Sequence, residues 1–246
     1  MIAELGGALR SLLFILLVGS PFSLFERRFG ARRVAYRSVL LRDLGASLTA
    51  VLLSLGAAFL LKTALAQLDV MTWLGLVPDL PLWASIPLAV LGTDFALYWV
   101  HRLVHTGALW RVHRWHHSPR HMYWLVGMRT SMLQQALYGM IPLLLVALRM
   151  SATFIAAYGL LGTLANHWMH ANLRFRSRWL EAVLVTPRMH HVHHSVDPRH
   201  HNRNFGSLFC IWDRMFGTFF DPDDVREPLE FGIPETVAAP RIVLGL

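Results

Sequence analysis

Long apolar runs constrain the fold of this chain more than any other feature. They lie near residues 9–25, 45–66, 82–100, 132–148 and 151–168, and roughly 20 helical residues suffice to cross the hydrocarbon core of a bilayer. Because 54% of the 246 residues are hydrophobic and only 15% are charged, a soluble domain of this size would leave too much apolar surface in water. We therefore expect an all-α, polytopic membrane protein with about four to five membrane helices.

Two features of these runs are open to more than one interpretation. The first run is either an uncleaved membrane helix or a signal peptide, and we favour the helix because no small-x-small cleavage site follows cleanly. The fourth and fifth runs are separated only by Arg149 and Met150, and the fourth contains Pro142. These two runs would therefore form either two full spans or a hairpin that dips into the membrane. No repeat or second domain interrupts the sequence, and we expect one domain over residues 1–246.

The arginines indicate how the helices are oriented. The segment after the first run contains Arg27, Arg28, Arg32, Arg33, Arg37 and Arg42, and the positive-inside rule makes this loop cytoplasmic. Alternation then places residues 67–81, which include no Lys or Arg, outside, and residues 101–130 and 169–246 inside. Every histidine consequently falls at or near the cytoplasmic face of a bacterial-type inner membrane. The formal charge of +8 is explained by topology, and nucleic acid is not an expected partner because the basic residues form no aromatic-interleaved groove.

The fourteen histidines recur mainly at helical spacing. Residues three or four apart share one face of an α-helix, which groups His101 with His105 and His167 with His170. The pattern H-x-x-H-H occurs twice, and one-face sets then contain His113, His116 and His117 in the first copy and His190, His193 and His194 in the second. His191 is turned about 100° away from its neighbours, and His121, His200 and His201 are interpreted as loop residues. Repeated clusters of neutral imidazoles indicate a site for two metal ions.

The identity of the metal follows less directly from the residues. Zinc typically takes four ligands, so about nine histidines exceed the needs of one zinc ion, and no glutamate adjoins a cluster as an HExxH protease would require. A nitrogen-rich site for two ions favours iron, with zinc as a substitute, and the single cysteine, Cys210, excludes a cysteine-based site. Two other classes stay open: a membrane protein that binds or transports metal without redox chemistry, and a bis-histidine haem protein, which would leave the repeated triplets unexplained.

Six stretches occur in one order between about residues 93 and 221: DFALYWVHRLVH, LWRVHRWHHS, HAN, VTPRMHHVHHS, NRNFG and IWDRMFGTFF. Together they resemble the fatty acid hydroxylase / sterol desaturase superfamily. The stretch Arg129–Thr130–Ser131 and the TPRMHHVHHS block are more similar to the branch that contains alkylglycerol monooxygenase and its bacterial relatives than to sterol C4 or C5 enzymes.

The resemblance implies a helical membrane enzyme with a cytosolic cap around two iron ions. Such an enzyme would oxidise an unactivated C–H bond of a membrane lipid, by hydroxylation or desaturation, with dioxygen as co-substrate. It would also need a separate electron-donor protein or a reduced cofactor. The ligands that the resemblance implies are His101, His105, His113, His116, His117, His170, His190, His193 and His194. His167 stands where relatives often have an aromatic residue and ranks lower, as a tenth ligand.

Supporting roles are expected for three further side chains. Asp94 lies seven residues before His101 and hence on the same helix face, where it would orient a ligand imidazole, pair with an arginine of the cap, or bond to Tyr98 or Trp99. Asn172 and Asn204 would bond to ligand rings. The residues of the terminal motif, Trp212, Asp213 and Gly217, are expected to close the cap.

Overall fold

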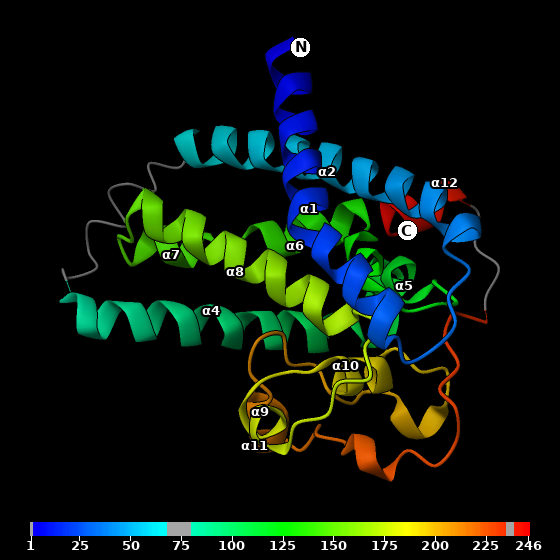
Figure 1. The fold of residues 1–246 in the computed structure, drawn as a ribbon. Helices are drawn as coiled ribbons and strands as arrows, with labels where there is room; N and C mark the ends of the chain where they lie inside the picture. The colour runs from blue at the N-terminus through cyan, green and yellow to red at the C-terminus, as the bar shows by residue number, and fades with distance from the viewer. Residues whose placement is uncertain (1, 68–79, 235–238) are drawn as a thin grey trace.

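The computed structural model describes residues 2–67, 80–234 and 239–246 (Figure 1). Within them the regular structure is helical, and extended segments meet only at three isolated β-bridges. Four long helices lie along the chain: α1 (Ile2–Phe29), α2 (Tyr36–Gln67), α4 (Leu82–Val104) and α8 (Ala152–His170). In Figure 1 the axes of α2, α4 and α8 lie roughly along one direction, with α2 antiparallel to the other two, and α1 crosses them. The all-α expectation is confirmed for the described residues.

All five apolar runs are helical, but the fourth is broken. It forms α6 (Met132–Gly139) and α7 (Leu143–Ala147), with Pro142 as the residue before α7. Proline lacks the N–H that would continue the first helix through this point. Arg149 then adopts a φ of 53° in the turn before α8, and the Ser151 side chain caps α8 by accepting the Phe154 N–H. The expected outside loop, residues 67–81, lies almost entirely outside the described residues.

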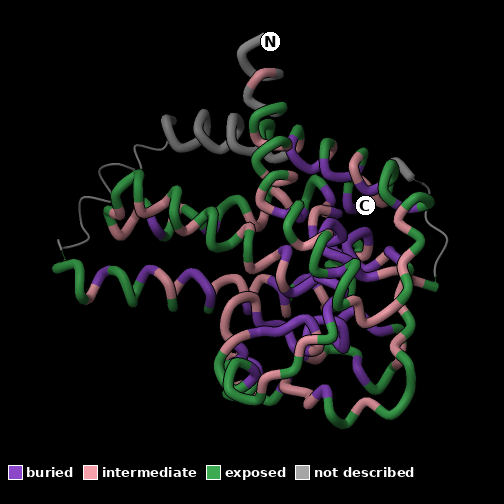
Figure 2. Tube along the Cα trace, viewed as in Figure 1, coloured by how far each residue is buried: buried purple, intermediate pink, exposed green. Residues whose placement is uncertain are grey.

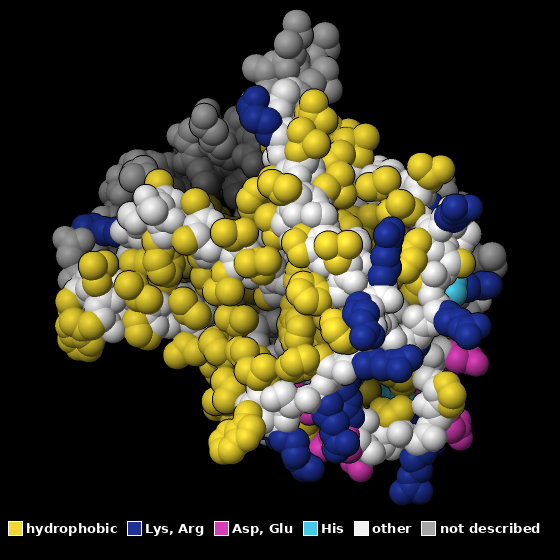
Figure 3. All heavy atoms as spheres, in the orientation of Figure 1, with side chains coloured by type: hydrophobic (Ala, Val, Ile, Leu, Met, Phe, Trp, Pro, Cys, Tyr) yellow, Lys and Arg dark blue, Asp and Glu magenta, His cyan; other side chains and the backbone are white. Residues whose placement is uncertain are grey.

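Two of the described helices are long and apolar enough to cross a membrane, over Leu9–Phe29 and Leu82–Val104. At a rise of about 1.5 Å per residue, α6 and α7 are each too short to do so. Many large apolar side chains of α1 and α4 are nevertheless exposed, including Leu17 at 74% and Trp83 at 79%. Figure 3 shows hydrophobic side chains across this face, whereas Lys and Arg side chains gather from the C-terminal end of α1 downward over the cap. Exposed apolar surface of this extent is typical of contact with lipid.

Short helices form the remainder of the chain. They are α5 (Trp110–His117), α9 (Arg178–Val183), α10 (Pro187–His193), α11 (Ile211–Met215) and α12 (Ala239–Leu244), with 3₁₀ turns at Gly107–Leu109, Trp124–Met128, Pro198–His200 and Pro222–Asp224. Helices α9, α10 and α11 lie together below the long helices in Figure 1, and we call residues 171–234 the cap. Pro187 occupies the first turn of α10, where its missing N–H is not needed.

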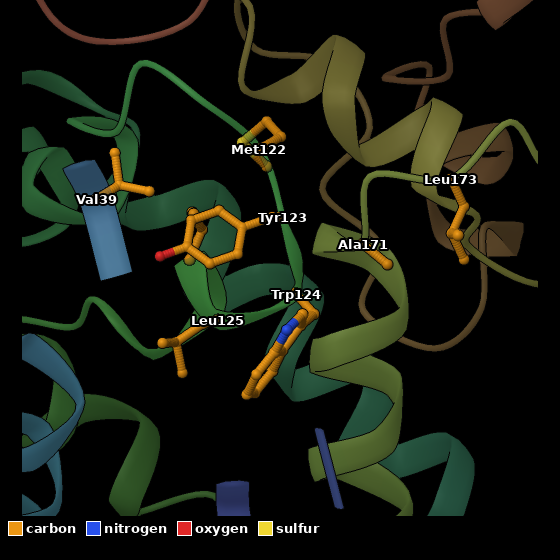
Figure 4. Packing of buried hydrophobic residues seen from close by; sticks show 8 residues of the cluster. Val39, Met122, Tyr123, Trp124, Leu125, Ala171 and Leu173 are labelled. Carbon is orange, nitrogen blue, oxygen red and sulfur yellow. The ribbon is translucent and has the colours of Figure 1, made fainter. Parts of the chain in front are cut away.

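The buried core joins the cap to the long helices. Its main cluster, drawn in Figure 4, consists of Val39, Met122, Tyr123, Trp124, Leu125, Val126, Ala171 and Leu173. These residues come from α2, from the segment after α5 and from the chain that leaves α8. Figure 2 shows that burial concentrates in this part of the molecule, while the far ends of α4 and α8 are mostly exposed. The packing therefore fixes the helix ends on which the histidines lie.

Candidate metal centre

The structure brings nine histidines into two neighbouring groups. Within each group the candidate ligand atoms all lie within 4.8 Å of one another. The groups draw on the C-terminal ends of α4 and α8, on α5 and on α10, because helical spacing aligns each set on one face. We call them the five-histidine group, His101, His105, His113, His117 and His193, and the four-histidine group, His116, His170, His190 and His194.

Facing Nε2 atoms within the groups lie about as far apart as ligands of one ion. In the five-histidine group the distance is 3.1 Å between His101 and His113 and again between His117 and His193. In the other group, His170 Nε2 lies 3.1 Å from that of His116 and 3.0 Å from that of His190. Nitrogens bound at right angles to one ion at about 2.1 Å lie about 3 Å apart. The spacing thus fits metal coordination.

Hydrogen bonds at the opposite ring nitrogen fix the tautomer of several imidazoles. The Nδ1–H of His116 donates to the Arg129 carbonyl at 3.1 Å, and that of His170 donates to the Asn166 carbonyl at 2.7 Å. In the five-histidine group, His101 and His193 donate in the same way to the carbonyls of Phe205 and Arg203, at 2.9 and 2.8 Å. A neutral imidazole has only one N–H, so these four rings present a bare Nε2 lone pair to the centre.

The pair formed by His116 and His170 shows why a cation fits here. Both rings place their proton on Nδ1, so two Nε2 lone pairs face each other at 3.1 Å with no hydrogen between them. Two such lone pairs repel unless a positive charge lies between them. Within the described part of the chain, His105 Nε2 is also buried without a hydrogen-bond partner. These unprotonated or unpaired ring nitrogens have the chemistry of ligands to a first-row metal ion.

Burial keeps the rings in the form that binds metal. Desolvation is the main cause that lowers the pKa of His113 and His117 well below the usual value, and neighbouring imidazoles lower it further. The pKa of His190 and His194 is lowered for the same two reasons. Neutral rings are therefore available as ligands at physiological pH.

Two cavities reach the histidines from different directions. The first, of about 320 Å³, is bounded by α4, α6 and α8 and reaches His101, His116 and His170; its wall is mostly apolar, with Leu97 and Leu161 among the lining residues. The second, of about 550 Å³, reaches the five-histidine group from the cap, and Trp110, Arg120 and Phe231 line it. An apolar route and a more polar route thus end at the same pair of groups.

Comparison with known proteins identifies the family. The family model described as fatty acid hydroxylase matches residues 86–218, which is more than half of the chain and includes every histidine of the two groups. The chain belongs to the fatty acid hydroxylase family. The expected relationship is thereby confirmed at the level of the family.

The relatives that match this chain are named for different lipids. The chain is 36% identical over 138 residues to alkylglycerol monooxygenase of Danio rerio, 32% identical over 149 residues to ornithine lipid hydroxylase OlsE of Rhizobium tropici, and 30% identical over 146 residues to Delta(7)-sterol 5(6)-desaturase of Eremothecium gossypii. These matches cover 56%, 58% and 54% of the chain but only 31%, 44% and 37% of the relatives. The chain thus spans less than half the length of each relative in these matches. No solved structure matches it.

The other histidines of the protein lie outside both groups. His167 is fully buried, with its Nδ1 3.2 Å from the Trp124 carbonyl and its ring packed against the Trp124 ring. His191 faces away from the centre, as its helical position predicts, and it lies between the Arg32 guanidinium and the His170 carbonyl, at 2.9 and 3.3 Å. Of the expected loop histidines, His200 is buried against Ser195 and His201 is exposed.

The three side chains expected in supporting roles hold loops together. Asp94 accepts hydrogen bonds from the N–H groups of Leu208 and Phe209, at 2.8 and 3.1 Å, and from the indole of Trp212, at 2.8 Å. Asn172 exchanges hydrogen bonds with the backbone of Arg32. Asn204 binds the backbone of Met189 and Phe220. Their described bonds connect the cap to itself, to the segment after α1 and to α4.

The terminal motif ties segments of the cap to one another. Asp213 accepts the N–H groups of Phe205 and Gly206, each at 2.8 Å, and the Thr218 hydroxyl at 2.6 Å. Gly217 has a φ of 70°, a conformation that glycine adopts without strain. Since the Phe205 carbonyl accepts the His101 Nδ1–H, this loop also supports a candidate ligand.

Sequence reasoning missed the groups that hold the rings from outside. The acceptors at Nδ1 are backbone carbonyls, and any residue type can provide one. Asp43 of α2 was also missed: it binds the guanidinium of Arg129, whose own carbonyl accepts the His116 proton. The one signal available for it was an acidic residue directly after Arg42 of the arginine-rich segment, two positions before the apolar run 45–66.

Proposed function

We propose that this chain is a membrane-embedded oxygenase that hydroxylates or desaturates a lipid at a histidine-ligated di-iron centre. The two bare Nε2 lone pairs of His116 and His170, which face each other at 3.1 Å in one of two adjacent histidine groups at the end of an apolar cavity, are the observation that supports it most directly. Family membership supports the reaction class. Iron is proposed because iron in a nitrogen-rich site for two ions can carry out dioxygen chemistry, whereas zinc has no redox chemistry.

The proposed assignment gives one ion to each group. The five-histidine group would hold one iron and the four-histidine group the other, with zinc as a substitute in its absence. When bound, the metal pair would supply the redox chemistry that activates dioxygen. The chain itself would hold the ligand rings in one tautomer through its backbone carbonyls, which requires no reorganisation when metal binds.

The Phe205 side chain would help keep water away from the centre. It is 1% exposed, and its ring centroid lies 5.1 Å from that of His105 and 5.5 Å from that of His193. Its backbone carbonyl meanwhile accepts the His101 proton. One residue thus orients a ligand and covers two others with hydrocarbon, which limits side reactions of an activated oxidant.

The lipid would enter through the cavity between α4, α6 and α8. Its apolar wall suits an acyl, alkyl or sterol-like chain, and the cavity reaches histidines of both groups. The named relatives act on alkylglycerols, ornithine lipids and sterols, which supports a lipid substrate and leaves the class broad. The exposed apolar faces of α1 and α4 would open this route to the bilayer rather than to water.

We propose that the centre faces the cytoplasm. The arginine-rich segment after α1 lies against the cap, since Arg32 bonds to Asn172 and His191 and Gly30 bridges to Leu173. The positive-inside rule would place this segment, and the cap with it, on the cytoplasmic side of a multi-pass protein. Trp179 of α9, at 89% exposure, is of the residue type that settles at a membrane interface. The broken α6–α7 pair would dip into the bilayer without crossing it.

A separate donor would supply electrons, because reduction of dioxygen consumes more of them than a C–H bond releases. The second cavity reaches the five-histidine group from the cap and offers a route for electrons and protons that avoids the lipid. Either a protein donor or a small reduced cofactor would fit this proposal.

Metal analysis of paired variants tests the proposal. The protein would be purified anaerobically in detergent, and iron would be measured in wild type, in His117→Ala/His193→Ala and in His190→Ala/His194→Ala. We expect two irons per chain in wild type and about half that content in each double variant, because each removes ligands from one group. His121→Ala, which alters a histidine outside both groups, should retain wild-type iron.

Product analysis completes the test. The iron-loaded protein would be supplied with dioxygen, a chemical reductant and a lipid extract, and oxidised lipids would be sought by mass spectrometry. Folded wild-type protein that takes up zinc or copper but no iron, and oxidises no lipid, would favour a metal-handling role. An intense Soret absorption would instead indicate haem.

A further inference from the structure

One polar side chain in the wall of the apolar cavity has an unused hydrogen-bonding atom. Gln134 of α6 is 4% exposed, and its Oε1 is buried without a hydrogen-bond partner within the described part of the chain. The residue lines the cavity together with His113 and His116. Buried acceptors are nearly always satisfied in folded proteins. An unsatisfied one beside a reaction centre therefore indicates a partner that arrives with the ligand.

The local sequence offers Gln134 a partner that it does not use. Ser131 and Gln134 form the S-x-x-Q pattern of a capping box, in which the glutamine side chain bonds to the serine N–H. Here the Ser131 hydroxyl accepts the Gln134 N–H at 3.2 Å and donates to the Val112 carbonyl at 2.6 Å. The reciprocal bond from Ser131 N–H to the glutamine is not made, because Oε1 has no partner among the described residues.

These contacts hold the Gln134 backbone beside the histidines, while its buried amide oxygen stays without a partner among the described residues. Its backbone is tied through Ser131 to Val112, which directly precedes His113 of the five-histidine group. Its neighbour Gln135 also lines the cavity but differs, because its Nε2 donates to the Thr130 hydroxyl. Gln134 thus brings a buried, unpaired amide oxygen to the lining of a cavity that also reaches His113 and His116 and whose wall is mostly apolar.

We infer that Gln134 Oε1 accepts a hydrogen bond from a hydroxyl or amide N–H group of the lipid substrate. The inference rests on the proposed function and narrows it: the oxidised carbon lies near a hydrogen-bond donor of the lipid, not in the middle of an unsubstituted hydrocarbon chain. A site built around an acceptor discriminates against analogues that lack the donor, because its polar group then stays unsatisfied. The residue would set specificity without taking part in the chemistry.

The test compares two probe lipids with the same alkyl chain, one with a hydroxyl group and one with a methyl group in place of the hydroxyl hydrogen. Hexadecan-1-ol has a hydroxyl group, whereas 1-methoxyhexadecane retains the oxygen acceptor and lacks the O–H. Binding of the radiolabelled alcohol to iron-loaded, detergent-solubilised protein under anaerobic conditions would be measured in competition with the ether. We expect wild type to bind the alcohol about twofold to tenfold more tightly, as one hydrogen bond contributes, and Gln134→Met to bind both probes equally.

Two further variants control the comparison. Gln135→Met should retain the preference for the alcohol, because that amide is already bonded to Thr130. Gln134→Glu should also retain it, since a carboxylate still accepts a hydrogen bond. Iron content equal to wild type would show that Gln134→Met is folded.

Equal binding of the two probes by wild type would overturn the inference, whatever the variants do. An unchanged preference in Gln134→Met would also overturn it and would indicate that the alcohol binds the metal directly. In both cases the proposed function stands if the wild-type protein oxidises a lipid. Failure to bind either probe, together with failure to oxidise any lipid, would overturn both.

Discussion

A buried ion pair between α2 and the segment before α6 supports the metal centre from outside. Asp43 is 1% exposed and Arg129 is 4% exposed. The Arg129 Nε–H donates to Asp43 Oδ1 at 2.7 Å, its terminal nitrogen contacts the same oxygen, and the Tyr123 hydroxyl donates to Oδ2. The Arg129 carbonyl in turn accepts the Nδ1–H of His116. Loss of this pair should therefore affect both stability and metal binding.

The expected magnitude follows from what each change leaves unpaired. Asp43→Leu leaves a guanidinium buried without its carboxylate, and removal of one partner of a buried pair costs about 3–5 kcal/mol. Arg129→Met leaves the carboxylate and costs about the same. The double variant buries no unpaired charge, and apolar replacement of both partners is often close to neutral. It would still leave the Tyr123 hydroxyl without its acceptor, which costs about 1–3 kcal/mol.

A double-mutant cycle on the detergent-solubilised protein measures this coupling. Unfolding free energies would be obtained from urea titrations followed by tryptophan fluorescence, and iron content would be measured on each variant. We expect the double variant to be more stable than either single variant. Costs that simply add, or single variants that lose less than about 1 kcal/mol, would refute the idea that the pair is buried and coupled. Conservative Asp43→Glu should retain more iron than Asp43→Leu.

Three further outcomes are expected. Gly127→Ala should lower the iron content, because its Cβ would lie 2.7 Å from His170 Nδ1, whereas Gly92→Ala, with no atom within 4 Å of the new Cβ, should retain it. Asp223→Asn should reduce the acid sensitivity of unfolding: hydrogen bonding to Arg188 is the main cause that lowers the Asp223 pKa, so its stabilising effect is present above about pH 4 and is lost as the pH falls. Removal of metal with a chelator should lower the unfolding free energy. The expected loss is about 2.7 kcal/mol if the concentration of free metal before removal was 100 times the Kd. Iron analysis tests the glycine variants, and acid titration followed by circular dichroism tests Asp223→Asn. Thermal unfolding tests the removal of metal, and an unchanged value in any of these measurements would contradict its expectation.

The sequence by itself predicts the helices and most of the centre. Hydrophobic length predicts all five apolar helical regions, and helical spacing predicts which histidines share a face, including the outward orientation of His191. These features depend on contacts between residues three or four positions apart, which the order of residues determines directly. The order of motifs also predicts the family, which the match to residues 86–218 confirms.

Only the tertiary structure decides which rings meet and what holds them. His105 and His193 are 88 positions apart in the chain, yet their ring centroids lie 4.7 Å apart, because the fold brings the ends of α4 and α10 to the same centre. Asn172 and Asn204 were expected to bond to ligand rings, and for Asp94 a ligand ring, an arginine of the cap, and Tyr98 or Trp99 were left open as partners. The bonds of all three in the described structure instead hold loops of the cap. A carboxylate or amide can bond to whatever donor the fold brings to it. Sequence therefore indicates that such a group needs a partner, and long-range packing selects the partner.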